Sequence, residues 1–411
     1  MAHVFPFHAV TPRPETAARV SSPPYDVMST DEARAMANDN PLSFLRVIRS
    51  EIDLPATTNP YSNEVYIKAA ENYRELKQSA PMARSETPSY YVYQLEMNGH
   101  VQTGIAATPA VADYDDNIIK KHEKTRQAKE NDRTKHILTL RAQTGMVFLT
   151  YRDTETLDEL VAKSTTATPP QFDFTADDGV RHTLWIVPDE LTDQITAAFA
   201  DVPALYIADG HHRAASASRT CAELSKANPD APDDAAWTRF LAVIFPASQL
   251  QILPYNRVVK GLNRHTPDKL LESIQDIAKI TPANSPTPTD PGTVCMYVDK
   301  NWWTLELNAD PSTLPPVDAL DVSLLQNQIL APLLGIEDPR TDDRIDFVGG
   351  IRGTGELEKR VDNGSADIAF SMYPTTVDQL MAIADADEIM PPKSTWFEPK
   401  LRDGLLVHEI Y

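Results

Sequence analysis

The chain has 411 residues, 42% of them hydrophobic and 24% charged, the composition of an ordinary soluble globular protein long enough for two or three domains. Its formal net charge of −21 argues against non-specific binding of nucleic acid, because such binding needs a basic surface. No apolar run approaches the roughly 18 residues of a membrane span, and the N-terminus lacks the basic start and apolar run of a signal peptide, so we expect a cytoplasmic protein with no membrane or nucleic-acid partner.

The N-terminal part of the chain alternates short strands with helices. Ser29 stands before acidic residues and an alanine-rich run, which is the pattern of a helix cap. Asn98-Gly99 separates two apolar runs and is the favoured two-residue hairpin turn. The predicted elements are a strand over 4–10, a helix over 33–37, a strand over 44–49, a helix over 64–78 and a hairpin over 89–107.

A polar segment of net positive charge follows, over residues 117–141. Within 120–133 stand four lysines, two arginines and a histidine against two glutamates and one aspartate, although the whole protein is acidic. An exposed, charged helix face is the plain interpretation. The apolar pair at 118–119 instead predicts a strand that delivers His122 and Glu123 to a loop, where the carboxylate of Glu123 lies among cations. The segment has no H-E-x-x-H metal motif, because Arg126 stands where the second histidine is needed.

Residues 204–217 predict a strand, a tight turn and a helix, and we expect the functional site to be built around them. Leu205-Tyr206-Ile207 is an apolar run typical of a buried strand, and Asp209-Gly210 breaks it. After the break, small and apolar residues recur at helical spacing, namely Ala214, Ala217, Cys221 and Leu224. Such a turn aims free N–H groups and the positive end of the helix dipole at an anion such as phosphate.

The remaining chain predicts a domain boundary and a smaller C-terminal domain. We place the boundary near residue 260, ahead of a predicted helix and of a loop rich in Pro, Ser and Thr. Thr376 and Gln379 have the spacing of a capping box for a helix that ends near residue 386. The other predicted elements are strands over 145–151, 183–187, 240–245, 345–348 and 368–372, an edge strand or turn over 253–259, and a helix over 267–278.

Two C-terminal segments carry groups suited to phosphate. Four glycines within 349–355 could form a phosphate-cradling nest, although they match neither G-x-G-x-x-G nor the P-loop pattern. Lys393, Ser394 and Thr395 offer an ammonium and two hydroxyls side by side after a proline pair. The second segment suits phosphate or a small polar substrate.

The polar segments resemble motifs of a known superfamily. Asp209-Gly210-His211-His212-Arg213 resembles the nucleotide-binding turn of the ParB/sulfiredoxin superfamily, and within it the D-G-H-x-R of the free serine kinases. His122-Glu123 resembles the loop whose glutamate serves those kinases as catalytic base, and Lys393-Ser394-Thr395 resembles their Lys-Thr/Ser-Thr segment. The chain is also similar to a widespread bacterial family with S-P-P-Y-D, H-E-x-T, D-G-H-H-R and P-P-K-S-T signatures.

The resemblance implies an α/β fold of the mixed α+β kind. It predicts a ParB/sulfiredoxin-like catalytic core over 1–260, with an N-terminal extension and an insertion near 150–200, and a smaller α+β domain over 261–411 that closes over the site. Sulfiredoxin activity is disfavoured because the reactive cysteine would align with His211. The acidic charge and the lack of a basic helix-turn-helix disfavour a DNA clamp.

The resemblance also implies phosphoryl transfer to a small hydroxyl, with free L-serine as acceptor and ATP, ADP or pyrophosphate as donor. Glu123 would accept the hydroxyl proton, and Asp209 would orient the acceptor or hold Mg²⁺, the expected cofactor, through water. Donor phosphates are expected on Gly210, His211, His212 and Arg213, and substrate contacts from His122, Lys129, Asp132, Arg133, Lys393, Ser394 and Thr395. Two alternatives stay open: a nucleotide-binding regulator without catalysis, and a metal-dependent hydrolase with His211, His212 and Asp209 as ligands.

Overall fold

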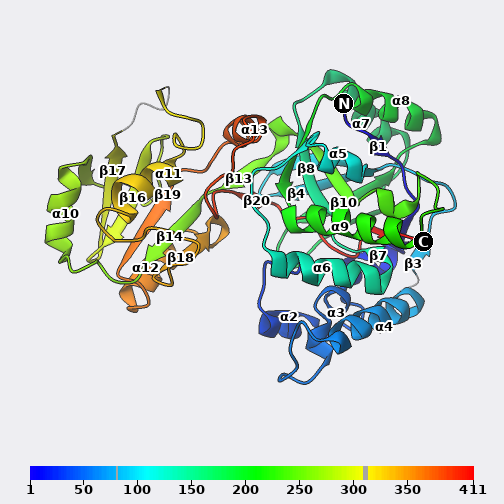
Figure 1. Cartoon of the computed structure of the whole chain (residues 1–411), viewed down its shortest axis with the longest axis horizontal. Helices are drawn as coiled ribbons and strands as arrows, with labels where there is room; N and C mark the ends of the chain where they lie inside the picture. The colour runs from blue at the N-terminus through cyan, green and yellow to red at the C-terminus, as the bar shows by residue number, and fades with distance from the viewer. Residues whose placement is uncertain (80–81, 309–312) are drawn as a thin grey trace. The chain divides into compact units, whose positions relative to one another are not determined.

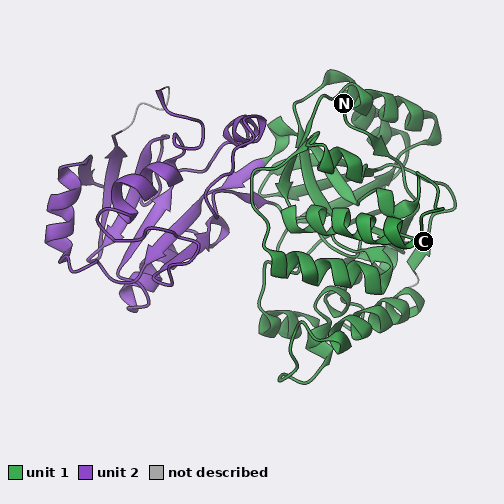
Figure 2. Ribbon diagram, viewed as in Figure 1, with its two compact units in different colours: residues 1–250, 399–411 green, residues 251–398 purple. Residues whose placement is uncertain are grey.

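The computed structural model describes residues 1–79, 82–308 and 313–411 and divides the chain into two compact units of mixed α and β structure (Figures 1 and 2). The first unit is Met1–Leu250 together with Pro399–Tyr411, and the second is Gln251–Glu398. The expected boundary near residue 260 thus lies ten residues earlier, after Leu250. The last segment of the chain, expected in the C-terminal domain, returns to the first unit.

The first unit is built on a large mixed sheet and a smaller one. The large sheet has the strand order β6-β11-β8-β12-β5-β4-β10-β9, with β1 paired to β5, and the smaller one has the order β3-β2-β21-β7. Its strands are β1 Val4–Phe5, β2 Ala9–Pro12, β3 Met82–Arg84, β4 Tyr91–Met97, β5 His100–Pro109, β6 Ile119–Lys120, β7 Ala142–Gln143, β8 Val147–Tyr151, β9 Phe172–Thr175, β10 Arg181–Ile186, β11 Leu205–Asp209, β12 Ala242–Pro246 and β21 Val407–Glu409.

Some helices of this unit cover the large sheet. The N-terminal helices α2, α3 and α4 form a separate helical layer, in which α4 packs against α6. The helices of this unit are α1 Pro14–Val20, α2 Thr30–Ala37, α3 Leu45–Ile48, α4 Asn63–Ser79, α5 Val111–Asp115, α6 Gln127–Leu140, α7 Glu155–Ala167, α8 Asp189–Ala200 and α9 His211–Ala227, with 3-10 turns η1 Ser50–Asp53, η2 Ala236–Thr238 and η3 Ala247–Gln249.

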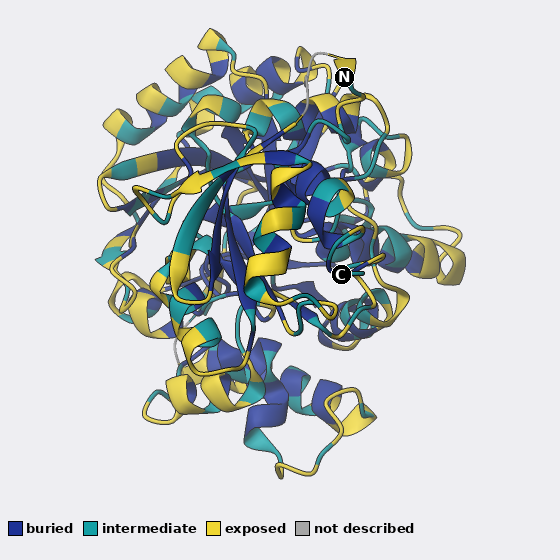
Figure 3. Ribbon diagram, turned by 90° about the vertical axis from the view of Figure 1, so that its left-hand side faces the viewer, coloured by how far each residue is buried: buried dark blue, intermediate teal, exposed yellow. Residues whose placement is uncertain are grey.

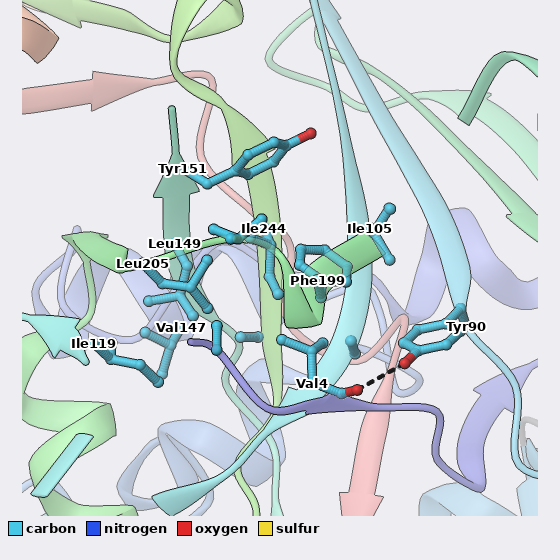
Figure 4. Close-up of a cluster of buried hydrophobic side chains, with 14 of the residues drawn as sticks. Val4, Tyr90, Ile105, Ile119, Val147, Leu149, Tyr151, Phe199, Leu205 and Ile244 are labelled. Carbon is cyan, nitrogen blue, oxygen red and sulfur yellow. Dashed lines mark hydrogen bonds between the residues drawn. The ribbon is translucent and has the colours of Figure 1, made fainter. Parts of the chain in front are cut away.

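The main core lies between the large sheet and helices α7, α8 and α9. Figure 4 shows side chains of this cluster, among them Phe199 of α8, Leu149 of β8 and Ile244 of β12, and the Tyr90 hydroxyl donates to the Val4 carbonyl at 2.8 Å. Phe199 is fully buried, and burying one such side chain contributes about 1.5–3 kcal/mol. Figure 3 shows that buried residues follow the strands and that exposed residues lie on the outer turns of the helices.

The second unit is a smaller sheet with helices packed against it. Its strands run in the order β15-β17-β16-β19-β14-β18, and β13 pairs with β20 in a separate ladder. The strands are β13 Gln251–Leu253, β14 Tyr255–Val259, β15 Ala278–Pro282, β16 Thr293–Val298, β17 Asn301–Leu307, β18 Ile345–Gly349, β19 Ile368–Met372 and β20 Trp396–Glu398. The helices are α10 Pro267–Gln275, α11 Asp321–Leu325, η5 Gln326–Leu330, η6 Gly350–Arg352, α12 Gly355–Asp362 and α13 Val377–Asp385.

Local sequence signals predict many of these elements correctly. The Asn98-Gly99 hairpin is β4–β5, and both predicted helix caps are present, since Ser29 and Thr376 each accept a backbone N–H in a full capping box. None of the helices in the described ranges combines the length and apolarity that crossing a membrane requires.

Three predictions about individual elements are wrong. Residues 44–49 form helix α3 and not a strand, because Phe44, Val47 and Ile48 bury one face at helical spacing. The first strand is divided into β1 and β2 around Pro6, which lacks the N–H that a ladder needs. Strand β14 lies between β19 and β18 and not at an edge. Pro254, which has no N–H for a ladder, precedes the strand and so does not interrupt its pairing.

The glycines at 349–355 have a packing role in the second unit. A Cβ on Gly349 would lie 2.8 Å from the Trp396 ring, and one on Gly350 would lie 2.6 Å from the Pro254 carbonyl oxygen. These two positions therefore need glycine for close packing, which accounts for part of the glycine-rich pattern without a phosphate.

Buried histidines make the fold sensitive to acid. Burial lowers the pKa of His136 to about 4, helped by the nearby charge of Arg133, and burial also lowers the pKa of His408 to about 4 and of His182 to about 3. A histidine that is neutral in the fold takes up a proton on unfolding once the pH falls below about 6.5, so stability decreases from there downward.

We therefore expect the free energy of unfolding to be lower at pH 5 than at pH 7, measured by urea titration. His136→Gln keeps a side-chain N–H for the Val47 carbonyl, to which His136 Nε2 donates at 3.0 Å. In this variant the difference in unfolding free energy between pH 7 and pH 5 should be smaller by about 2 kcal/mol. This value is about 1.36 kcal/mol for each of the roughly 1.5 pH units between pH 6.5 and pH 5. An unchanged pH dependence in the variant contradicts the assignment.

Candidate functional site

The predicted strand, turn and helix at 204–217 are present as β11, Gly210 and α9. Gly210 has φ +98°, in the left-handed region that favours glycine, and it directly precedes the helix. Strand β11 pairs in parallel with β6, with Leu205 opposite Ile119 and Tyr206 opposite Lys120. Two parallel strands end at the same edge of a sheet, so the loop that follows β6 and the turn that follows β11 lie together, as ligand-binding loops of α/β proteins do.

The two histidines at the start of α9 hold the loop that follows β6. The backbone N–H of His122 donates to His211 Nε2 at 3.4 Å, and that of Arg126 donates to His212 Nε2 at 3.0 Å. The rings of His122 and His211 also pack edge to face, 4.4 Å between centroids. The histidine pair therefore fixes residues 122–126 against the helix N-terminus, a contact that the sequence did not predict.

Glu123 lies on this loop, beside His211. Its Oε2 is 3.9 Å from His211 Nδ1, and its side chain is 51% exposed. Because His211 Nε2 accepts the His122 N–H, a neutral His211 carries its proton on Nδ1, which faces the carboxylate. Burial, together with the nearby charge of His122, lowers the pKa of His211 well below its usual value, so that the ring is neutral at pH 7.

Asp209 forms an ion pair with Lys400, which belongs to the segment that returns to the first unit. Their Oδ2 and Nζ atoms are 2.9 Å apart, and the side chains are 30% and 18% exposed. Burial alone would raise the pKa of Asp209, but Lys400 and Arg213 outweigh it and hold that pKa below its ordinary value. Asp209 is therefore a carboxylate at neutral pH.

Arg213 faces the sheet and the S-P-P-Y-D loop. Its Nη1 donates to the Met146 carbonyl at 2.8 Å, and its Nη2 donates to the Asp26 carboxylate at 3.2 Å. Its Nε is buried with no hydrogen-bond partner among the described residues, as is Oδ2 of Asp403. Burial raises the pKa of Asp403 to about 7, although Arg213 lowers it. A donor-phosphate role for Arg213 stays a prediction.

The candidates on the basic segment are divided between the loop and helix α6. His122 is 2% exposed, and burial lowers its pKa to about 4 although Asp209 opposes the shift. Asp132 accepts from the Tyr66 hydroxyl at 2.7 Å and pairs with Arg133. Lys129 donates to the Tyr61 hydroxyl at 3.2 Å. The three α6 residues Lys129, Asp132 and Arg133 line one pocket.

Lys393, Ser394 and Thr395 lie in the second unit, and their part in the site stays a prediction. Lys393 adopts a left-handed conformation, φ +57°, with its ammonium 5.3 Å from the centre of the Tyr255 ring. Arg257 donates to the Lys393 carbonyl at 3.1 Å. Arg257 is 3% exposed and also donates to the Tyr255 carbonyl, but among the described residues it forms no ion pair with a carboxylate. A buried cation without a carboxylate partner is costly and favours an anion nearby.

Several of the residues described above had not been singled out from the sequence. Asp26, Lys400 and Asp403 meet the D-G-H-H-R turn from opposite ends of the chain, and no local pattern pairs residues that far apart. The S-P-P-Y-D signature was the one available signal for Asp26. Arg257 carried none, because a single arginine in an apolar strand does not show whether it is buried.

The described residues contain no group of three or more His, Cys, Asp or Glu placed to hold a metal ion. The ligand set expected for a hydrolase is not assembled, since His211 and His212 accept backbone N–H groups and Asp209 pairs with Lys400. Asp209 could still serve a Mg²⁺ ion that arrives with donor phosphates, because Mg²⁺ is held in that way by one or two carboxylates.

The fold and site define a mixed α+β protein of two units, with a polar centre where β6 and β11 end. The chain belongs to the family described as "Protein of unknown function (DUF1015)", which matches residues 4–323. No curated protein matches the sequence.

The chain is similar, at low TM-score, to several solved structures, of which three are described. A conserved hypothetical protein from Pyrococcus furiosus has 13% identity and a TM-score of 0.35, over 73% of this chain and 93% of that one. A free serine kinase in complex with AMP has 10% identity and a TM-score of 0.35, over 72% and 86%. SbnI with a C-terminal truncation, from Staphylococcus aureus, has 10% identity and a TM-score of 0.39, over 72% and 84%.

Proposed function

We propose that this protein is a small-molecule kinase that transfers a phosphoryl group to the hydroxyl of free L-serine and forms O-phospho-L-serine. The donor is ATP, ADP or pyrophosphate. The observation that carries the proposal is the placing of Glu123 beside the N-terminus of α9, with Oε2 3.9 Å from His211 Nδ1. A carboxylate base and a phosphate-binding helix end are two of the parts that phosphoryl transfer to a hydroxyl uses.

The proposed reaction begins with the removal of a proton by Glu123. The carboxylate accepts the serine hydroxyl proton while the hydroxyl oxygen bonds to the terminal phosphorus of the donor. The bond from that phosphorus to the bridging oxygen breaks, and AMP, ADP or phosphate leaves. Neutral His211 lies beside the base, with Nδ1 3.9 Å from Glu123 Oε2, and its Nε2 accepts the His122 N–H, which fixes the loop.

Charge on the donor would be held at the start of α9. The donor phosphates would meet the backbone N–H groups of His211 and His212, which open the helix, whereas that of Arg213 donates to the Gly210 carbonyl at 2.8 Å. Asp209 would hold Mg²⁺, which neutralises phosphate charge when it is bound with the donor. Contacts of Lys393, Ser394 and Thr395 with the phosphate or the amino-acid carboxylate are proposed from their sequence resemblance alone.

The test is a donor assay on the full chain. Protein, Mg²⁺ and L-serine are incubated with ATP, ADP or pyrophosphate in turn, and phosphoserine is measured by phosphorus NMR. We expect phosphoserine with at least one donor and none without a donor. The absence of product with all three contradicts the proposal, and thermal stabilisation by a nucleotide without turnover would identify a binding regulator instead.

A further inference from the structure

The pocket lined by Lys129, Asp132 and Arg133 lies in the first unit, between helix α6 and the N-terminal helical layer. We call it the α6 pocket; Arg49, Glu51, Tyr61, Lys129, Asp132 and Arg133 are among the residues that line it. Its volume is about 150 Å³, which is room for several water molecules or for a metabolite of similar bulk. The N-terminal extension provides one wall and the basic segment provides the other.

The charges of the α6 pocket are unequally paired. Arg49 and Glu51 form an ion pair of 2.9 Å, and Asp132 pairs with Arg133 at 2.8 Å. Lys129 has the Tyr61 hydroxyl as partner and, in the described part of the chain, no carboxylate. Three cations therefore face two carboxylates in a protein whose net charge is −21, so the pocket attracts a negative group.

Two of the lining side chains are held firmly and keep polar atoms for a ligand. Arg133 stacks on the Tyr25 ring, 4.2 Å from its centre, and uses Nε and Nη2 for Asp132, which leaves Nη1. Glu51 is 9% exposed and uses Oε1 for Arg49 and for the Thr30 hydroxyl, which leaves Oε2. A fixed cation and a fixed carboxylate thus stand in one small pocket.

We infer that the α6 pocket binds the α-amino-acid end of a small zwitterion, with Lys129 and Arg133 on its carboxylate and Glu51 on its ammonium group. This arrangement complements both charges of an amino acid, and the volume admits one with a short side chain. The inference rests on the proposed function for its link to catalysis, since it makes the α6 pocket the acceptor site.

The α6 pocket and the loop that carries the proposed base come from neighbouring stretches of the chain. Lys129 is in the first turn of α6, three residues after Arg126, whose backbone N–H donates to His212. Tyr25 and Arg133 also line the small pocket that contains Arg213, and Asp26 bonds to that arginine. The α6 pocket and the α9 N-terminus are therefore connected by residues of a single unit.

The experiment compares Lys129→Met with Lys135→Met. Lys135 is on the same helix and also lies over a tyrosine, Tyr66, but it does not line the α6 pocket. We expect Lys129→Met to raise the KM for L-serine at least tenfold and to leave the KM for the donor unchanged, whereas Lys135→Met should change neither. Thermal unfolding of both variants verifies that they are folded.

The outcomes separate this inference from the proposed kinase activity. Turnover in the wild type with an unchanged serine KM in Lys129→Met overturns the inference and leaves the function standing. If the wild type gives no phosphoserine, the function fails, and calorimetry with the individual amino acids then tests the α6 pocket directly. Binding that Lys129→Met weakens tenfold supports the inference, and no binding of any amino acid overturns it. Ethanolamine and glycerate, each lacking one charge, should bind more weakly than serine.

Discussion

Glu123→Gln is expected to lower the kcat for phosphoserine formation by about 10²–10⁴-fold, the usual contribution of a general base. Glutamine keeps the size of the side chain and a polar oxygen beside His211, but it cannot take the hydroxyl proton. The dissociation constant of the donor, measured by calorimetry, should change less than threefold, because the carboxylate is not among the groups proposed to bind it.

The matched control is Glu223→Gln, which removes an exposed carboxylate from helix α9 and should leave kcat unchanged. It corrects for the loss of one negative charge from the first unit, at a position far along α9 from the candidate site. Full activity in Glu123→Gln would show that the proton goes elsewhere, and equal losses in both variants would show an effect of charge alone.

The parts of the site that the sequence predicts are those made by neighbouring residues. Asp209-Gly210 between an apolar run and an alanine-rich run is sufficient for a strand, a turn and a helix, and the structure has all three. The Ile118-Ile119 pair likewise predicts the strand that delivers Glu123 to a loop. Both strands and the helix follow from local periodicity, and the turn follows from the conformational freedom of Gly210.

The parts that could not be predicted depend on pairing between distant residues. The parallel ladder of β6 and β11 brings Glu123 to His211, yet β6 has only two residues and no pattern that selects its neighbour. The same applies to the N-terminal wall of the α6 pocket. The strand prediction for residues 44–49 was wrong for a different reason. A short apolar run fits a strand and a helix equally well until the packing around it determines which face is buried.

The ion pair of Asp209 and Lys400 leads to the second prediction of large effect. Lys400→Met leaves the Asp209 carboxylate partly buried without its ammonium partner. Removing one partner of a buried pair costs about 3–5 kcal/mol, and we expect about 2–3 kcal/mol here because Asp209 keeps 30% of its side chain exposed. The measurement is the free energy of unfolding by urea titration at pH 7.

The double variant Asp209→Asn/Lys400→Met separates the cost of an unpaired charge from the loss of packing. With no charge left to compensate, it should recover more than half of the stability lost in Lys400→Met, while activity stays low if Asp209 acts in catalysis.

The pH dependence of the ion pair has a definite sign, because the pKa of Asp209 is lowered in the fold. The pair stabilises the protein at neutral pH, and this contribution is lost as the pH falls below about 4. The wild type and Lys400→Met should therefore approach one another in acid. A difference in stability that does not depend on pH would mean that Lys400 acts through the packing of its aliphatic chain, and Asp209 would then need another source of its low pKa, of which Arg213 is the nearest candidate.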